Sequence, residues 1–303
     1  MSALRSRVSL HPYAFDGSAP PGHGGLYCSM LLDDFDHQQY AFEIGLDYGE
    51  HDPARGAAVV AGLLDELGFG SEDPARLFVR LVTAVGHDHL MYGRSMFELY
   101  TDDQDPMPGA RLGVLPGWSL QRRIWGTFQN TQTAGEQARR KIPADVLVTF
   151  ELPVQLRRDL HRTWQCLTAL RPSHTALTPV TADLARSSYD RAAHRRSLDA
   201  MAARATRSIG WDGRELFLPQ ATSSYRIYRR LRFLRTWLAV ADSVLATLNQ
   251  VCAHPEVCAD VPLTISVSGL PTIEDIDGYM AAVADGSQSL DSIVETVFDS
   301  RSA

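Results

Sequence analysis

The stretch "GHDHLMYG" has the most metal-like spacing in the sequence, because His87 and His89 flank Asp88. Imidazole and carboxylate groups bind zinc, manganese and iron, so these residues are a candidate site for a metal-dependent hydrolase or nuclease. In a helix, residues two apart point about 200° apart around the axis, so the two imidazoles converge on one ion only if the helix has ended by Gly86. The spacing therefore favours the alternative, a polar helix end.

Other groups that could do chemistry are weaker candidates. "CAHPEVC" offers Cys252, His254 and Cys258, but a structural zinc site needs a fourth ligand. Two acidic stretches, "DDFD" and "TDDQD", could hold Mg²⁺, although solvated loops are the commoner use of such acids. Their aspartates are Asp33, Asp34, Asp36, Asp102, Asp103 and Asp105. The sequence has no nucleophile elbow, no P-loop and no Gly-x-Gly-x-x-Gly after a strand, so we expect a protein that is not an enzyme and needs no cofactor.

The stretch "SSYRIYRRLRFLRTW", residues 223–237, interleaves five arginines with aromatic and aliphatic residues. These arginines are Arg226, Arg229, Arg230, Arg232 and Arg235. At 100° per residue they surround a helix, whereas a helix that reads a DNA groove presents one basic face. They also lie near the positive end of the helix dipole, which disfavours each by about 0.3–1 kcal/mol. We therefore expect anions around them: phosphates, or carboxylates of flanking segments or neighbouring subunits.

Charge is unevenly distributed along the chain, whose net charge is −7. Lys and Arg number 12 against 20 Asp and Glu in residues 1–151, 16 against 6 in residues 152–235, and 1 against 10 in residues 236–303. A basic middle segment between acidic flanks is expected to bind either nucleic acid or the acidic flanks themselves, within one subunit or between subunits. Self-neutralisation is the interpretation that we favour.

Composition indicates a folded, soluble protein. The 303 residues are 45% hydrophobic, which is enough for one large or two modest domains. No window approaches the roughly 20 apolar residues of a membrane span, and the first residues lack the apolar run of a secretory signal. Four scattered cysteines do not form a disulfide framework, so we expect thiols, a reducing cytoplasm and no membrane partner.

Apolar periodicity and capping residues predict helices that alternate with short strands. Asp52–Pro53 and Asp73–Pro74 each supply a cap followed by proline at the first helical position. The helices are expected over residues 53–67, 74–92, 153–170, 181–210, 223–252, 272–286 and 287–298. The strands are expected over residues 94–103, 110–116, 119–129, 144–153 and 261–271.

This pattern predicts an α+β fold that is mainly helical, with a small antiparallel sheet and one helix of about 30 residues. A strand and two short helices end the chain. We divide the sequence into an irregular N-terminal arm, an α+β domain, a long-helix region and a C-terminal strand-helix-helix segment. Their boundaries are residues 1–30, 31–152, 153–252 and 253–303.

Several stretches, in this order, resemble the portal proteins of tailed double-stranded DNA phages. They are "YGRSMFELY" (92–100), "LGVLPGWSLQRRIWGTFQ" (112–129), "IPADVLVTFELP" (142–153), "YRIYRRLRFLRTWLAVADSVLATLN" (225–249) and "ISVSGLPTIEDIDGYMAAVADGSQSL" (265–290). The first three look like the helix end and strands of a portal, the fourth like its long late helix, and the last like its closing strand and helices.

The resemblance implies a bacteriophage structural protein, a homo-oligomeric ring of usually twelve subunits at one capsid vertex. A packaging motor drives double-stranded DNA through such a ring, capsid and tail-connector proteins attach to it, and it has no catalytic residues. The protein would belong to the virion and assemble in the host cytoplasm. The chain is shorter than is usual in the family, and residues 153–222 show no recognisable stem or clip. Two alternatives stay open: the metal-dependent hydrolase or nuclease, and a helical DNA-binding protein that grips with Arg226, Arg229 and Arg230.

Overall fold

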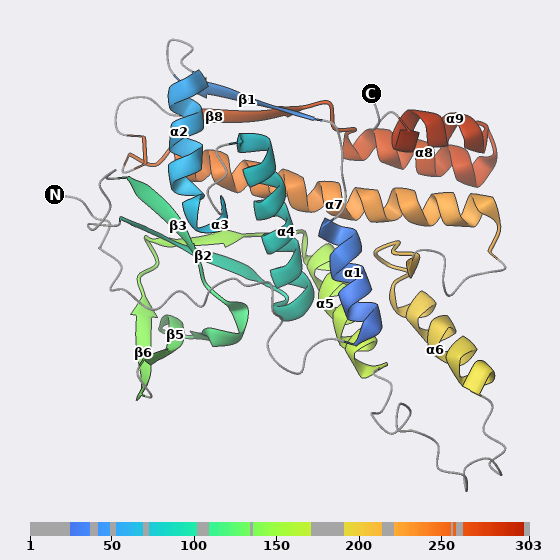
Figure 1. The fold of residues 1–303 in the computed structure, drawn as a ribbon, viewed down its shortest axis with the longest axis horizontal. Coiled ribbons are helices and arrows are strands. Elements are labelled where there is room, and N and C mark those ends of the chain that lie inside the picture. The colour runs from blue at the N-terminus through green and yellow to red at the C-terminus, as the bar shows by residue number, and fades with distance from the viewer. Residues whose placement is uncertain are drawn as a thin grey trace, which may run out of the picture. The chain divides into compact units, whose positions relative to one another are not determined.

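A computed structural model describes most of the chain (Figure 1). The described residues are 25–36, 42–48, 53–68, 73–101, 109–133, 136–170, 191–213, 221–255, 257–258 and 263–299. No helix among them is long and apolar enough to cross a membrane. The chain divides into two compact units, each built from discontinuous segments. Unit 1 contains residues 39–157 and 238–270, and unit 2 contains residues 18–38, 158–237 and 271–303.

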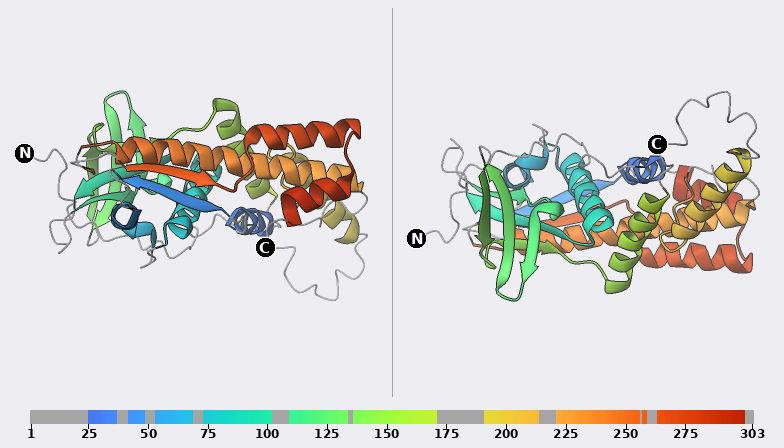
Figure 2. Two further views of the ribbon diagram at one scale, coloured as in Figure 1. Left: turned by 90° about the horizontal axis from the view of Figure 1, so that it is seen from above. Right: turned by 90° about the horizontal axis from the view of Figure 1, so that it is seen from below.

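In its described residues, unit 1 holds three small antiparallel sheets, in the orders β1-β8, β3-β2-β7 and β4-β5-β6. The strands are β1 (Glu43–Tyr48), β2 (Ser95–Thr101), β3 (Ala110–Val114), β4 (Leu120–Arg123), β5 (Gly126–Thr133), β6 (Glu136–Ile142), β7 (Leu147–Phe150) and β8 (Leu263–Ser268). Strands β1 and β8 are far apart in the sequence, yet they run side by side with Glu43 opposite Ser268 (Figures 1 and 2).

Helices pack beside these strands, namely α2 (Pro53–Leu63), α3 (Asp65–Gly68) and α4 (Pro74–Tyr92). Helix α4 begins where the sequence indicates, because the Asp73 side chain accepts a hydrogen bond from the Ala75 N–H at 3.1 Å. It ends at Gly93, whose φ of 68° is a left-handed conformation that favours glycine. Apolar residues recur every four positions along α4, so Leu77, Leu81 and Val85 lie on one face of the helix and are completely buried.

Helix α7 (Ser223–Cys252) is 30 residues long and contributes its first half to unit 2 and its second half to unit 1. The Thr222 hydroxyl accepts a hydrogen bond from the Tyr225 N–H at 3.2 Å, which caps the helix N-terminus. The later turns of α7 have a broad apolar face, whose buried residues are Trp237, Leu238, Val240, Ala241, Val244, Leu248 and Val251.

Unit 2 is helical in its described residues. It holds α1 (Leu26–Asp36), most of α5 (Val154–Ala169), α6 (Arg191–Ala205), the first half of α7, α8 (Ile273–Asp285), α9 (Leu290–Val294) and the π-helical turn η5 (Glu295–Asp299). Helix α8 starts with a capping box, in which Thr272 and Asp275 bond reciprocally to each other's backbone N–H. The Phe35 and Phe233 rings pack edge to face between α1 and α7, with centroids 6.1 Å apart.

The predicted fold class is confirmed: the protein is a mainly helical α+β protein with a 30-residue helix, a late strand and two short helices after it. Several details differ. The strand predicted over residues 119–129 is two strands, β4 and β5, because the chain reverses at Ile124–Trp125. Strands β1 and β6 were not predicted, and the helix predicted over residues 53–67 is interrupted at Leu64. Within the stretch expected to be irregular, residues 26–30 are the first turns of α1, and residues 1–24 lie outside the described residues.

Candidate interaction surfaces

The polar cluster at His87, Asp88 and His89 lies inside helix α4, which continues to Tyr92. The condition that would let the two imidazoles converge, a helix that ends by Gly86, is therefore not met. His89 is 1% exposed, and its Nε2–H donates to the Phe150 carbonyl at 2.9 Å.

Asp88 and His89 serve to hold α4 against strands β2 and β7. Asp88 accepts a hydrogen bond from the Ser95 hydroxyl at 3.0 Å, and His89 bonds to β7 through Phe150. Burial raises the pKa of Asp88 to about 8, against the lowering effects of Ser95 and Arg94. Burial also lowers the pKa of His89 to about 4, so at pH 7 both groups are predominantly neutral.

The other candidate ligands do not gather either. Among the residues that the structure describes, no group of three or more His, Cys, Asp or Glu side chains is placed to hold a metal ion. Cys252 is fully buried, and this burial raises the pKa of its thiol to about 12. Asp34 accepts a hydrogen bond from the Trp211 indole at 2.7 Å. The stretch "TDDQD" at 101–105 lies outside the described residues, apart from Thr101.

Arg229, at the centre of the arginine-rich stretch, points into unit 2 and is only 2% exposed. Its guanidinium donates to the Ala203 carbonyl at 3.0 Å, the Thr206 hydroxyl at 2.7 Å and the Trp211 carbonyl. A longer contact of 3.5 Å reaches the Gly210 carbonyl. Because these groups lie at and just beyond the C-terminal end of α6, Arg229 supplies the donors that a helix end lacks and a positive charge that its dipole favours.

The remaining arginines have varied environments. Arg232 donates to the Ser208 carbonyl at 2.8 Å, and Arg226 is partly buried. Arg235 forms a two-pronged ion pair with Asp277 of α8, at 2.5 and 3.0 Å. The exposed Arg230 guanidinium lies 4.1 Å from the centre of the Phe298 ring.

For Arg229, these contacts differ from the expectation that the five arginines meet phosphates, or carboxylates of flanking segments or neighbouring subunits. Arg229 is used within its own unit, and its partners are oxygens of the backbone and of one hydroxyl rather than carboxylates. Arg235 does find the expected carboxylate of a flanking segment, Asp277. The arginine stretch is thus largely a structural element of unit 2.

Comparison with known protein families gives no match. A comparison with curated proteins finds no similar sequence either. The function has to be inferred from the surfaces of the molecule itself.

The surface that stands out is the β4-β5 hairpin of unit 1. Arg123 pairs with Gly126, so Ile124 and Trp125 form a two-residue loop at the hairpin tip. Ile124 is 97% exposed and Trp125 68% exposed, the two highest values among large hydrophobic side chains of the described chain. Two-residue hairpin loops favour Asn, Asp and Gly, so the turn itself does not explain two large apolar residues there.

One face of the β4-β5-β6 sheet next to this tip is basic. The strand register places Gln121, Phe128 and Lys141 in one row across the three strands, and the pleat puts Arg123 and Arg139 on the same face. Arg139 lies over the Phe128 ring, 4.4 Å from its centre, and donates to the Gln121 side chain at 3.2 Å. None of the described side chains on this face is acidic.

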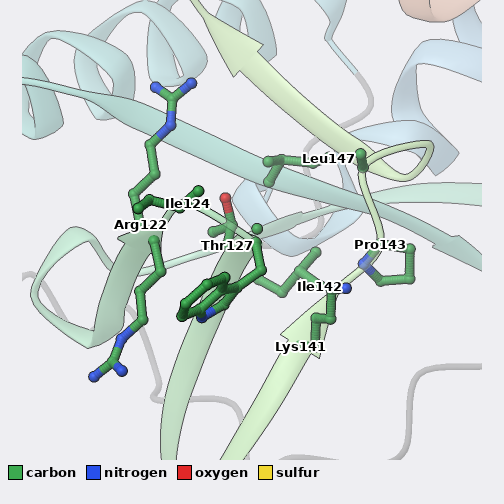
Figure 3. Close-up of a pocket in the computed structure, with 11 residues that line it drawn as sticks. Arg122, Ile124, Thr127, Lys141, Ile142, Pro143 and Leu147 are labelled. Carbon is green, nitrogen blue, oxygen red and sulfur yellow. The ribbon is translucent and has the colours of Figure 1, made fainter.

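A recess of about 650 Å³ opens beside the hairpin loop (Figure 3). Arg122 and Ile124 come from the hairpin, whereas Ile142, Pro143 and Leu147 come from the end of β6 and the start of β7. Basic side chains and apolar side chains therefore lie together around one opening. The sequence analysis missed this surface because it predicted one strand over "SLQRRIWGTFQ". The pattern that could have indicated a hairpin is Ile-Trp-Gly directly after two arginines within this β-rich stretch.

Proposed function

We propose that the chain is a non-catalytic subunit that assembles with copies of itself into a portal-like ring. The observation that carries the proposal is the exposed Ile124–Trp125 tip, since two large apolar side chains presented together at a protruding loop are typical of a protein–protein contact. Tryptophan is also among the residues that contribute most binding energy at such contacts.

The order of elements supports the portal-like form of this assembly. Helix α4 leads through Tyr92–Gly93 into β2, the sheet strands follow to β7, and the chain later forms the 30-residue α7, strand β8 and helices α8 and α9. This is the order of the segments on which the resemblance to portal proteins rests. In this proposal the ring lies at a capsid vertex of a virion, double-stranded DNA passes through it, and packaging-motor, capsid and tail-connector proteins bind to it.

The two alternatives have less support. A metal-dependent hydrolase would need His87, Asp88 and His89 to share an ion, but Asp88 and His89 are hydrogen-bonded between α4 and the strands. A helix that grips DNA through Arg226, Arg229 and Arg230 would need accessible guanidiniums, and Arg229 is buried.

Negative-stain electron microscopy of the purified chain tests the proposal. We expect ring-shaped particles with a central hole at micromolar protein concentration and physiological salt. Uniform particles of single-subunit size would contradict it. As a check on the alternatives, metal analysis and nuclease assays with added Mn²⁺ or Zn²⁺ are expected to be negative.

A further inference from the structure

The hairpin surface combines an apolar tip with exposed positive charge. We define it by Arg123, Ile124, Trp125, Arg139 and Lys141, all of which are exposed. Arg123 follows Gln121 by two residues on β4, and Lys141 lies two strands away from Gln121. Strand geometry therefore separates the Cα atoms of Arg123 and Lys141 by about 12 Å. A partner for this surface needs a flat apolar strip with negative charge at about that spacing.

Helix α8 presents such a strip. Glu274, Gly278, Ala281 and Asp285 recur at intervals of four, three and four residues and are all exposed, so they lie on one face of the helix; we call them the α8 stripe. The acids at its two ends are about 16 Å apart along the helix. The Asp285 carboxylate accepts a hydrogen bond from the Ser287 N–H at 2.8 Å. Hydrogen bonding to the Ser287 side chain and backbone holds the pKa of Asp285 below its usual range.

The middle of the α8 stripe is open and nearly featureless. A Cβ added at Gly278 would meet no atom within 4 Å, and Ala281 contributes only a methyl group. Large apolar side chains such as tryptophan and isoleucine can lie against such a surface because no large side chain stands at Gly278 or Ala281. The segment that carries the stripe is acidic: residues 263–299 contain seven Asp and Glu and no Lys or Arg. The cation beside it, Arg235 of α7, is paired with Asp277.

We propose that the hairpin surface of one copy docks on the α8 stripe of the next copy, tip against the small residues and cations against the flanking acids. The flexible stems of arginine and lysine close the difference of about 4 Å between the two charge spacings. The two faces are different, so the contact is head-to-tail, and such contacts build a ring when their rotation closes. The inference rests on the proposed self-assembly and names the surfaces that make it.

The rival occupant of the hairpin surface is a nucleic acid, whose phosphates would meet Arg123, Arg139 and Lys141. A second copy is favoured because phosphates leave the exposed Ile124 and Trp125 without an apolar contact, whereas the α8 stripe covers them. Each copy of the chain carries a net charge of −7, so its overall field opposes both partners, but it opposes a nucleic acid more strongly because the charge density of a polyanion is far higher.

The test uses two full-length variants that each damage one face. The hairpin variant is Ile124→Ser/Trp125→Ser, and the stripe variant is Glu274→Lys/Asp285→Lys. All four positions are exposed, so both variants are expected to keep the circular dichroism spectrum of the wild type and to melt within a few degrees of it. Control variants are Val154→Ser, an apolar side chain 52% exposed elsewhere, and Glu43→Lys/Asp47→Lys, two exposed acids of β1 outside the stripe.

We expect both face variants to be monomeric in light scattering, with self-association weakened about 30-fold or more, as for loss of an interface hot spot. The controls are expected to assemble like the wild type. An equimolar mixture of the two face variants is expected to form dimers and nothing larger, because only one pair of intact faces remains. A chain that combines Arg123→Glu/Lys141→Glu with the stripe variant has acids on the hairpin surface and lysines on the stripe. Opposite charges then face each other again, so this chain is expected to assemble.

Three results separate the possible failures. A monomeric wild type would contradict the proposed function itself. If the wild type assembled and each face variant assembled to the same extent, only the docking inference would be overturned. If Arg123→Glu/Lys141→Glu abolished binding of duplex DNA and left assembly intact, the hairpin surface would be a nucleic-acid surface and the docking inference would be wrong.

Discussion

Replacing Arg229 by methionine isolates the role of the most buried cation of the arginine stretch. The change keeps an unbranched stem of similar length and removes the guanidinium. In the wild type this group bonds to the Ala203 and Trp211 carbonyls and to the Thr206 hydroxyl. The Thr206 hydroxyl keeps a second hydrogen bond, to the Ala202 carbonyl at 2.9 Å. Most of the lost stabilisation therefore comes from the carbonyls of Ala203 and Trp211, which lose their guanidinium donor.

The expected effect follows from the number of acceptors affected. A buried acceptor that loses its donor costs about 1–3 kcal/mol, so the loss at the two carbonyls is about 2–6 kcal/mol and centres on about 3–5 kcal/mol. We therefore expect the free energy of unfolding to fall by about 3–5 kcal/mol. At about 2–4 °C per kcal/mol, the melting temperature falls by roughly 6–20 °C.

The measurement is denaturant unfolding followed by circular dichroism, with Arg230→Met as the matched control. The Arg230 guanidinium is exposed and lies over the Phe298 ring, a contact worth about 0.5–1 kcal/mol at such a site. The reasoning requires the loss at position 229 to be several times that at position 230. Equal losses would refute the role of Arg229 as the cap of helix α6.

Three further predictions concern stability. Gly210 has φ of 83°, and a Cβ there would lie 2.5 Å from the Arg229 carbonyl oxygen, so Gly210→Ala is expected to lower the free energy of unfolding by about 2–4 kcal/mol; a loss below 1 kcal/mol in a denaturant titration would contradict this. Because burial raises the pKa of Asp88 to about 8, the folded state binds more protons than the unfolded state between about pH 4 and pH 8, and wild-type stability falls as pH rises through that window. Asp88→Asn removes this dependence, so its melting temperature relative to wild type is expected to rise from pH 4 to pH 8, and a constant difference would exclude the effect. The Arg235–Asp277 pair is exposed, and a double-mutant cycle is expected to give about 0.2–1 kcal/mol that shrinks in 1 M NaCl; coupling that is unchanged by salt would rule out a screened surface pair.

Local chemistry made the helix boundaries predictable. Asp73 with Pro74, Thr222, and the Thr272–Asp275 capping box each act within three residues of the helix that they start. The pairing of β1 with β8 depends on residues more than 200 positions apart, and no short-range pattern specifies it. The helices of unit 1 were therefore easier to predict than the pairing of its strands.

The candidate surfaces were only partly predictable for related reasons. The arginine stretch was recognised as needing anions, but the partners of Arg229 are mostly backbone carbonyls, which carry no signature in the sequence. The hairpin tip lacks the Asn-Gly or Asp-Gly signal by which a two-residue turn is usually recognised. Ile124 and Trp125 instead resemble strand residues, so their exposure became visible only with the strand register.

The central claim, self-assembly through exposed surfaces, is tested most directly by the mass of the wild-type particle in solution. Multi-angle light scattering at micromolar concentration and physiological salt is predicted to give a discrete mass that is a multiple of the 33.5 kDa chain, with a multiple near twelve for the portal-like ring. A single species of 33.5 kDa across the whole concentration range would contradict the account.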